Sequence, residues 1–170
     1  MRRPLLRAAG LAPALLLVAC GGTTTGDLSA DALAAEVAAL YPAAGDARVD
    51  VRCAGPLAGE LGATQDCRVA VRRDVVTVRA TVTEESDEGP MFETVPVVAA
   101  DRVARTVLRA LVADEYVVGE VACEAELVGV VGESVACRAA PPDGGRRAGV
   151  TATVHRVEGL DVRIRYRLVG

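Results

Sequence analysis

Cysteine is the residue type whose spacing in this sequence most clearly indicates chemistry. The 170-residue chain contains five cysteines. Four of them form two pairs with identical spacing, Cys53 with Cys67 and Cys123 with Cys137. Thiols can oxidise to disulfides, bind a metal ion or take part in redox exchange, and the spacing between them helps to distinguish these roles. The fifth cysteine, Cys20, lies near the N-terminus and needs a separate explanation.

Cys20 follows a segment with the composition of a secretion signal. A basic start precedes a short apolar run over residues 11–18. The sequence Leu17-Val18-Ala19-Cys20 matches the lipobox of bacterial lipoproteins. This resemblance implies that residues 1–19 are a lipoprotein signal peptide and that the thiol of Cys20 accepts diacylglycerol. The basic start consists of Arg2, Arg3 and Arg7.

The lipobox predicts that Cys20 becomes the mature N-terminus, with residues 20–27 forming the lipidated cysteine and a flexible tether. Ordinary cleavage near Ala19 and an uncut membrane helix are the alternatives. A helix needs roughly twenty apolar residues to span a bilayer, whereas this run is shorter and contains Pro13. Two or more acyl chains anchor a protein stably. We therefore expect a lipid anchor at the extracytoplasmic face of the cell membrane.

An internal repeat becomes visible when the two cysteine pairs are aligned. Leu57 and Gly62 lie between the first pair, and Leu127 and Gly132 occupy the corresponding positions between the second. Because Leu127 lies 70 positions after Leu57, the period of the repeat is 70 residues. The chain is therefore predicted to contain two copies of one unit.

The repeat selects one of the three disulfide pairings that four cysteines allow. Equivalent folds should close equivalent bonds, which pairs Cys53 with Cys67 and Cys123 with Cys137. Export beyond the cytoplasm favours oxidation of these thiols. A metal site or a redox centre is the alternative, but both usually use Cys-x-x-Cys spacing, which these residues lack. The sequence predicts two structural disulfides and no metal.

The apolar pattern predicts one helix followed by four strands in each copy. Ser29 and Asp101 are the expected N-caps of the two helices, and Pro42 is expected to end the first. The fold class is therefore α+β: two tandem repeats, each with one helix packed on a four-stranded antiparallel sheet and one disulfide per repeat. The first repeat, 28–98, has its helix near 29–40 and strands near 48–53, 64–72, 75–83 and 91–98. The second repeat, 99–170, has its helix near 100–113 and strands near 116–123, 133–139, 148–157 and 160–168.

The cysteine spacing, the leucine, the glycine and the strands that follow resemble the domain of unknown function 4333, which occurs in actinobacterial secreted and lipid-anchored proteins. The second copy is the closer match, through residues 131–137, whereas the first has Gln65-Asp66 before its second cysteine. The family has no assigned activity, so the resemblance implies location and fold. In architecture, the tandem units are also similar to secreted β-lactamase inhibitor proteins.

Other residue types give no catalytic or cofactor site. His155 is the only histidine, and neither Ser86 nor Ser134 lies in a recognisable nucleophile turn. The acidic run 84–88 lacks the ordered spacing of a calcium loop and is expected to be a solvated hairpin tip. No glycine-rich loop has the phosphate-binding pattern. We expect no catalytic residues and no cofactor.

An alternating pattern near the C-terminus places three arginines on one face of the last strand. The arginines are Arg163, Arg165 and Arg167, and they alternate with Val162, Ile164, Tyr166 and Leu168. One interpretation is a charged edge that prevents aggregation. The other is a surface for an anionic partner such as lipid headgroups, an envelope polymer or an acidic protein, with help from Arg102, Arg105 and Arg109 on the second helix.

Charge and composition narrow the class of partner. Of the 19 basic residues, three lie in the signal segment, which leaves 16 against 23 acidic residues and a net charge of about −7. This balance argues against nucleic acid. We expect an exported lipoprotein, bound to the membrane through Cys20, that acts as a non-enzymatic binding or interaction module towards an envelope polymer or an exported protein. An inhibitor-like module that binds another secreted protein is the first alternative, and a hydrolase is the second.

Overall fold

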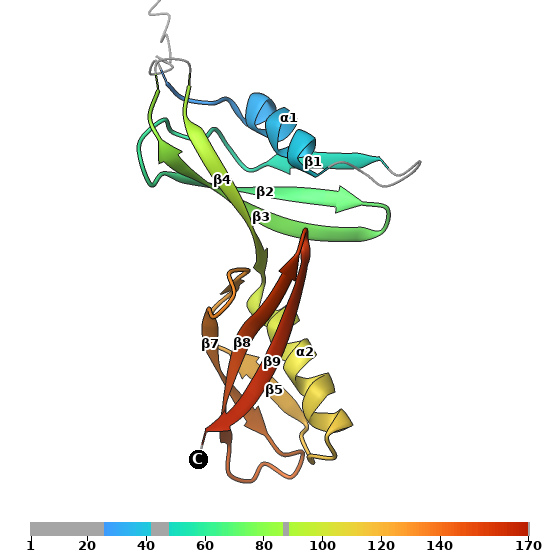
Figure 1. Ribbon diagram of the computed structural model, residues 1–170. Helices are drawn as coiled ribbons and strands as arrows, with labels where there is room; N and C mark the ends of the chain where they lie inside the picture. The colour runs from blue at the N-terminus through green and yellow to red at the C-terminus, as the bar shows by residue number, and fades with distance from the viewer. Residues whose placement is uncertain (1–25, 42–47, 87–88, 170) are drawn as a thin grey trace, which may run out of the picture.

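The structure is a computed structural model that describes residues 26–41, 48–86 and 89–169. This part of the chain forms two helices and two antiparallel sheets, and its two halves lie end to end in an elongated molecule (Figure 1). The signal segment 1–19, Cys20, Pro42 and most of the tether lie outside the described residues.

The first half contains one helix and four strands: α1 (Ala30–Leu40), β1 (Val49–Cys53), β2 (Thr64–Val71), β3 (Asp74–Glu84) and β4 (Met91–Val98). The second half contains one helix and five strands: α2 (Ala100–Ala113), β5 (Glu120–Cys123), β6 (Leu127–Val128), β7 (Ser134–Ala140), β8 (Ala148–Glu158) and β9 (Asp161–Val169).

The first helix begins as the sequence predicts. The hydroxyl of Ser29 accepts a hydrogen bond from the amide of Ala32 at 3.2 Å, which satisfies one of the free N–H groups of the first turn. Leu33 and Val37, one helical turn apart, are the buried residues of α1. The helix therefore binds its sheet through a narrow apolar stripe.

The second helix is correctly predicted in extent but not in its cap. Its N-cap is Ala99, which has no side chain able to accept a hydrogen bond, and the prediction of Asp101 as the cap is wrong. Asp101 instead lies in the first turn, where its carboxylate binds Arg105 at 2.6 Å. The start is fixed by β4, because that strand continues to Val98 and the helix begins directly after it.

The first sheet has five strands, in the order β1-β2-β3-β4-β6, where the sequence predicted four. The additional strand, β6, comes from the second half and pairs with the end of β4 through Val97↔Val128 and Val98↔Leu127. A two-residue strand is too short to give an alternating pattern, which explains why the sequence did not reveal it. The second sheet has the order β5-β7-β8-β9.

Several backbone hydrogen bonds recur in the two halves. The amide of Gly62 donates to the carbonyl of Val82 at 2.9 Å, and the amide of Gly132 donates to that of Val154 at 2.9 Å. Both glycines have positive φ, 80° and 99°, a conformation that residues with a Cβ rarely adopt. The bridge between Leu28 and Leu57 likewise corresponds to the pairing of Val98 with Leu127.

Each half has its own apolar core, and the two cores approach each other at the junction. Leu160, in the turn between β8 and β9, packs against the core of the first half. Val98, the last residue of β4, belongs to the core of the second. The first core contains Leu33, Val37, Leu57, Cys67, Val69, Val78, Ala80 and Val82. The second contains Val103, Val107, Leu111, Val121, Leu127, Val135, Val150, Ala152 and Val154, among others.

Candidate functional site

The four paired cysteines form the two predicted disulfides. Cys53 bonds to Cys67, and Cys123 bonds to Cys137. In each case the two residues lie directly opposite one another on neighbouring antiparallel strands. Cys67 and Cys137 are buried within the two cores, so the bonds are internal crosslinks and not accessible redox groups.

The three arginines of β9 lie where the alternating pattern places them. β9 is an edge strand of the second sheet, and Arg163, Arg165 and Arg167 are all exposed. The intervening Val162 and Ile164 are partly buried and pack against the second core. We call the exposed side of these three arginines the arginine face.

The ion pairs of the arginine face are unevenly distributed. Arg163 binds the carboxylate of Asp161 at 2.8 Å. Among the described residues, Arg165 and Arg167 have no acidic partner within ion-pair distance. Two guanidinium groups are therefore available to an anionic partner, while the third is already partly neutralised.

The helix arginines cannot extend the arginine face, contrary to the suggestion from the sequence. α2 packs on the side of the sheet that carries Ile164 and Tyr166, through Val103 and Val107. Its exposed residues therefore point away from the opposite side of the sheet, where the arginine face lies. The helix arginines have their own local partners: Arg105 binds Asp101, and Arg109 donates to the carbonyl of Arg105.

Neither His155 nor the described part of the acidic turn at 84–88 lies in a cluster of groups that could act together as a catalytic or metal site. His155 is exposed at the register shift of β8 and forms no side-chain hydrogen bond to a described residue. In the acidic turn, a carboxylate oxygen of Glu85 accepts the amide of Leu61 at 2.8 Å, and the hydroxyl of Ser86 donates to the carbonyl of Gly89 at 2.8 Å. Within the described ranges, no three His, Cys, Asp or Glu side chains could hold a metal ion together.

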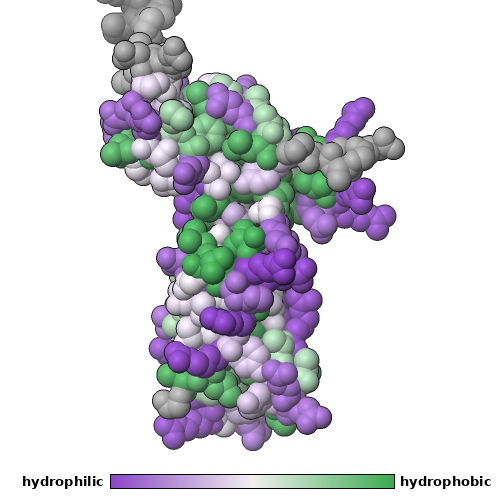
Figure 2. Space-filling model, viewed as in Figure 1, coloured by the Kyte–Doolittle hydropathy of each residue, from purple (hydrophilic) through white to green (hydrophobic). Residues whose placement is uncertain are grey.

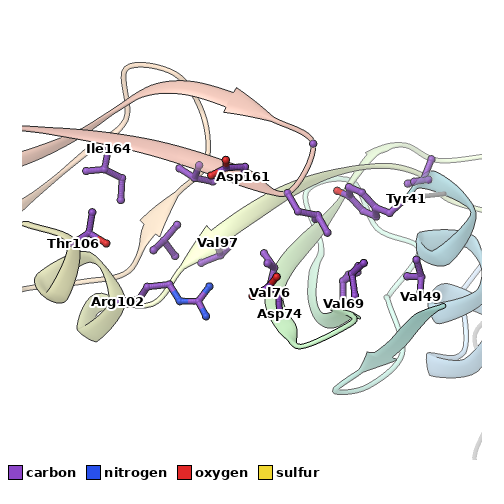
Figure 3. Close-up of a pocket in the computed structure, with 16 residues that line it drawn as sticks. Tyr41, Val49, Val69, Asp74, Val76, Val97, Arg102, Thr106, Asp161 and Ile164 are labelled. Carbon is purple, nitrogen blue, oxygen red and sulfur yellow. The ribbon is translucent and has the colours of Figure 1, made fainter. Parts of the chain in front are cut away.

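A groove that the sequence did not reveal lies at the junction of the two halves, and we call it the junction groove. Its cavity has a volume of about 740 Å³. Figure 3 shows side chains of both halves around it. Separately from the groove lining, Figure 2 shows hydrophobic surface near the waist on the face that it draws. The lining residues are Leu40, Tyr41, Val49, Val69, Val71, Asp74, Val76, Val97, Val98, Arg102, Thr106, Gly159, Leu160, Asp161, Val162 and Ile164.

The arrangement of α1 explains why the groove exists. α1 packs on β1 and part of β2. Among the described residues, no helix lies over the end of the sheet at the β2–β3 turn (Figure 1). The end of α1 is held by the hydroxyls of Tyr41 and Thr94, which lie 2.8 Å apart. The turn at Leu160 covers part of the remaining apolar surface. The uncovered part, with Val71 and Val76, forms one wall of the groove.

The charged groups of the groove lie among the residues of its margin. Arg102 donates from Nη2 to the carbonyl of Val75 at 3.3 Å and has no acidic partner among the described residues. Asp161 is held by Arg163 at 2.8 Å. Asp74, at the start of β3, forms no ion pair within the described part of the chain. The groove thus combines an apolar interior with one uncompensated cation and one uncompensated acid.

An ion-pair cluster joins the two halves on another side of the junction. Arg79 of the first sheet binds Asp66 at 2.8 Å and Glu126, from the second half, at 2.7 Å. Hydrogen bonds to these two carboxylates raise the pKa of Arg79 above its ordinary value. Together with the β4–β6 pairing, this cluster fixes the relative position of the walls of the junction groove.

Comparison with known proteins gives no assignment. No family model, no curated protein and no solved structure matches this chain. Among the described residues, no helix is long and apolar enough to cross a bilayer. The resemblance to the domain of unknown function 4333 stays a prediction.

Proposed function

We propose that this chain is an exported lipoprotein, anchored through lipidated Cys20 at the extracytoplasmic face of the cell membrane, and that it acts there as a non-enzymatic binding protein. The observation that carries the binding role is the junction groove, because a largely apolar cavity between two structural units is typical of a ligand site. The groove has no convergent nucleophile and base among its described lining residues.

Tandem duplication of one small unit is the second part of the proposal. The spacing of the disulfides supports it, because both close the same length of chain, 14 residues apart in sequence. The recurring hydrogen bonds of Gly62 and Gly132, and the equivalent partners of Leu57 and Leu127, support it independently. A duplication creates a junction between units, and that junction contains the groove.

The position of Gly26 supports anchoring by the first half. Gly26 lies against Gly59, at the end of the first half that is remote from the second (Figure 1). The six residue-to-residue steps from Cys20 to Gly26 can span at most about 20 Å when fully extended. A protein lipidated at Cys20 therefore keeps its first half near the membrane, while the second half extends away from it.

The arginine face supports the second candidate, an inhibitor-like module that binds another exported protein. It lies on an edge strand of the half that is remote from Gly26, so it would lie farther from the anchoring membrane than the first half does (Figure 1). An edge strand offers unpaired backbone groups to a partner strand, and Arg165 and Arg167 would favour acidic side chains on that strand. Lipid headgroups of the same membrane are a less suitable partner.

Lipidation of Cys20 gives the experiment that tests the proposal. In bacteria grown with an alkyne analogue of palmitate, the full chain is expected to incorporate the label and to sediment with membranes. Cys20→Ser should abolish the labelling, because no other residue can accept the diacylglycerol. Thr23→Ser, a matched change three residues into the tether, should retain the labelling. Labelling that persists in Cys20→Ser would refute the anchor.

A further inference from the structure

We propose that the junction groove binds a single-chain anionic amphiphile. Its apolar chain would lie along the wall that contains Val71 and Val76, and its acid group would lie near Arg102. This inference rests on the proposed binding role of the groove, but it does not depend on lipidation of Cys20. Three features of the groove support it: the size of its apolar residues, the nature of its walls and the distribution of its charges.

The apolar wall is specific to the first half. The corresponding positions of the second half, taken from the 70-residue offset and from the pairing of Cys67 with Val78 and of Cys137 with Val150, carry smaller or cyclic residues. Three partly exposed valines, Val49, Val71 and Val76, have the counterparts Gly119, Pro141 and Ala148, whereas Val69, the counterpart of Ala139, lines the cavity but is itself fully buried. The first half therefore presents more apolar surface at this end of its sheet than the second half does.

Packing between the halves accounts for only part of this apolar surface. Leu160 covers the first core, yet a cavity of about 740 Å³ remains beside it. That volume lies within the range of roughly 300–1,000 Å³ that is typical of small-molecule sites. Each methylene group that leaves water for such a wall contributes about 0.8 kcal/mol. A flexible hydrocarbon chain can therefore bind to this wall through the hydrophobic effect alone.

The walls suit a hydrocarbon chain better than a peptide. The apolar part of the walls includes the side chains of Val71, Val76 and Ile164, which offer no hydrogen-bond donors or acceptors. A peptide in the same place would bury backbone N–H and C=O groups, and each such group costs free energy unless it finds a partner. The uncharged side-chain hydroxyls of the lining are those of Thr106 and of Tyr41, which lies 2.8 Å from the hydroxyl of Thr94, and two hydroxyls cannot satisfy a peptide backbone.

The charges indicate where an acid group would bind. Arg102 extends towards Val76 in Figure 3, and its guanidinium keeps donors free beyond the bond to the Val75 carbonyl. It also lies in the first turn of α2, where the helix dipole adds positive potential. Asp161 is already neutralised by Arg163. The carboxylate of Asp74 would repel a bound anion, whereas Arg102 would attract it. Substitutions at Asp74 and Arg102 should therefore change the affinity in opposite directions.

The test uses the full chain carrying Cys20→Ser, so that no acyl chain of its own can occupy the groove, and the fluorescent fatty acid cis-parinaric acid as the probe. Val76→Glu should weaken binding by roughly tenfold or more, because it places a charge in the apolar wall. Ala148→Glu, the matched change in the second half, should leave the affinity within about twofold. Val71→Phe narrows the groove without adding charge and should also weaken binding. Its thermal unfolding verifies that the loss is local.

A second set of variants, at charged residues, tests where the acid group of the ligand binds. Arg102→Gln should weaken binding roughly tenfold, the loss expected for a charge-assisted hydrogen bond. Asp74→Asn should strengthen it. Arg109→Gln, on the same helix but outside the groove, should have no effect. An alkyltrimethylammonium probe of equal chain length should bind more weakly than the acid.

Three results would overturn the inference. They are absence of saturable binding of cis-parinaric acid, equal effects of Val76→Glu and Ala148→Glu, and unchanged affinity in Arg102→Gln. None of them would affect palmitate labelling of Cys20, so a failure of this inference is distinguishable from a failure of the proposed anchor. Conversely, an unlabelled chain that still binds the probe would leave the groove proposal standing.

Discussion

The effect of the disulfides can be stated residue by residue. Cys53 and Cys67 lie opposite each other at the end of β1, and the chain between them carries Leu57 into the core. Closing this loop lowers the conformational entropy of the unfolded chain and also holds the leucine in place. The same description applies to Cys123, Cys137 and Leu127.

The first prediction concerns the loss of one disulfide. The double variant Cys53→Ala/Cys67→Ala should lower the free energy of unfolding by about 3 kcal/mol, the value expected for a loop of about 15 residues. Equilibrium unfolding in urea, read by circular dichroism, measures it. Cys123→Ala/Cys137→Ala should cost a similar amount, because the closed loop has the same length. An unchanged midpoint in either variant would contradict the structural role.

The second prediction concerns Tyr166. Its hydroxyl donates a hydrogen bond to the carboxylate of Asp114, and this bond raises the pKa of Tyr166 from 10.0 to about 12. Because the folded-state pKa lies above the unfolded value, the bond contributes stability below about pH 10 and loses it as the pH rises towards 12. In Asp114→Asn the pKa should fall towards 10, as measured by ultraviolet absorbance of the phenolate. No difference between the two titrations would contradict the contact.

At the scale of elements, the sequence predicted the helices and strands that are long enough to show a periodic apolar pattern. Ser29 correctly marked the start of α1, and the repeat correctly paired Cys53 with Cys67 and Cys123 with Cys137. Periodicity could not reveal β6, because two residues contain no period. Asp101 was mistaken for a cap because an acidic residue in the first turn has the same composition signal as an N-cap.

The junction groove was not predictable because its walls come from elements that are distant in sequence. Val76 of β3 and Ile164 of β9 both look like ordinary core residues in their own strands. A usable signal was nevertheless present in the repeat. Comparison of the two copies shows valines at 49 and 76 where the second copy has glycine and alanine. Such a difference indicates that the side chains at these positions have different roles in the two units.

The third prediction tests the helix caps. Ala99 has the extended backbone of an N-cap, with φ −57° and ψ 146°, but no side-chain acceptor. Ala99→Ser should therefore raise the free energy of unfolding by about 1 kcal/mol, whereas Ser29→Ala should lower it by about 1 kcal/mol. Urea unfolding of the two variants gives both values. A destabilised Ala99→Ser variant would mean that the serine does not cap α2.

At the scale of the whole molecule, the first half leads to the proposed membrane anchor, whereas the second half carries the arginine face. Gly26 leads from the first half towards Cys20, and the arginine face belongs to the second half. The pairing of β4 with β6 and the bond between Arg79 and Glu126 hold the halves together, so the fold keeps the arginine face in the half that is remote from Gly26 (Figure 1). A partner of the arginine face therefore meets it at a distance from the anchoring membrane.

The fourth prediction separates the two interpretations of the arginine face. Arg165→Gln/Arg167→Gln should reduce salt-sensitive binding to isolated envelope fractions if the face holds an anionic partner. Arg105→Gln/Arg109→Gln, which removes equal charge from the opposite side of the second half, is the matched control and should have little effect. Equal binding by both variants and the unchanged chain would leave the arginines as a protective edge.

The anchor is the central claim, and intact-mass spectrometry of the protein extracted from membranes without reduction tests it most directly. The predicted result is a chain that begins at Cys20, carries a diacylglyceryl group on that residue and retains the Cys53–Cys67 and Cys123–Cys137 disulfides. A chain that begins at another residue, or that begins at an unmodified Cys20, would contradict the claim.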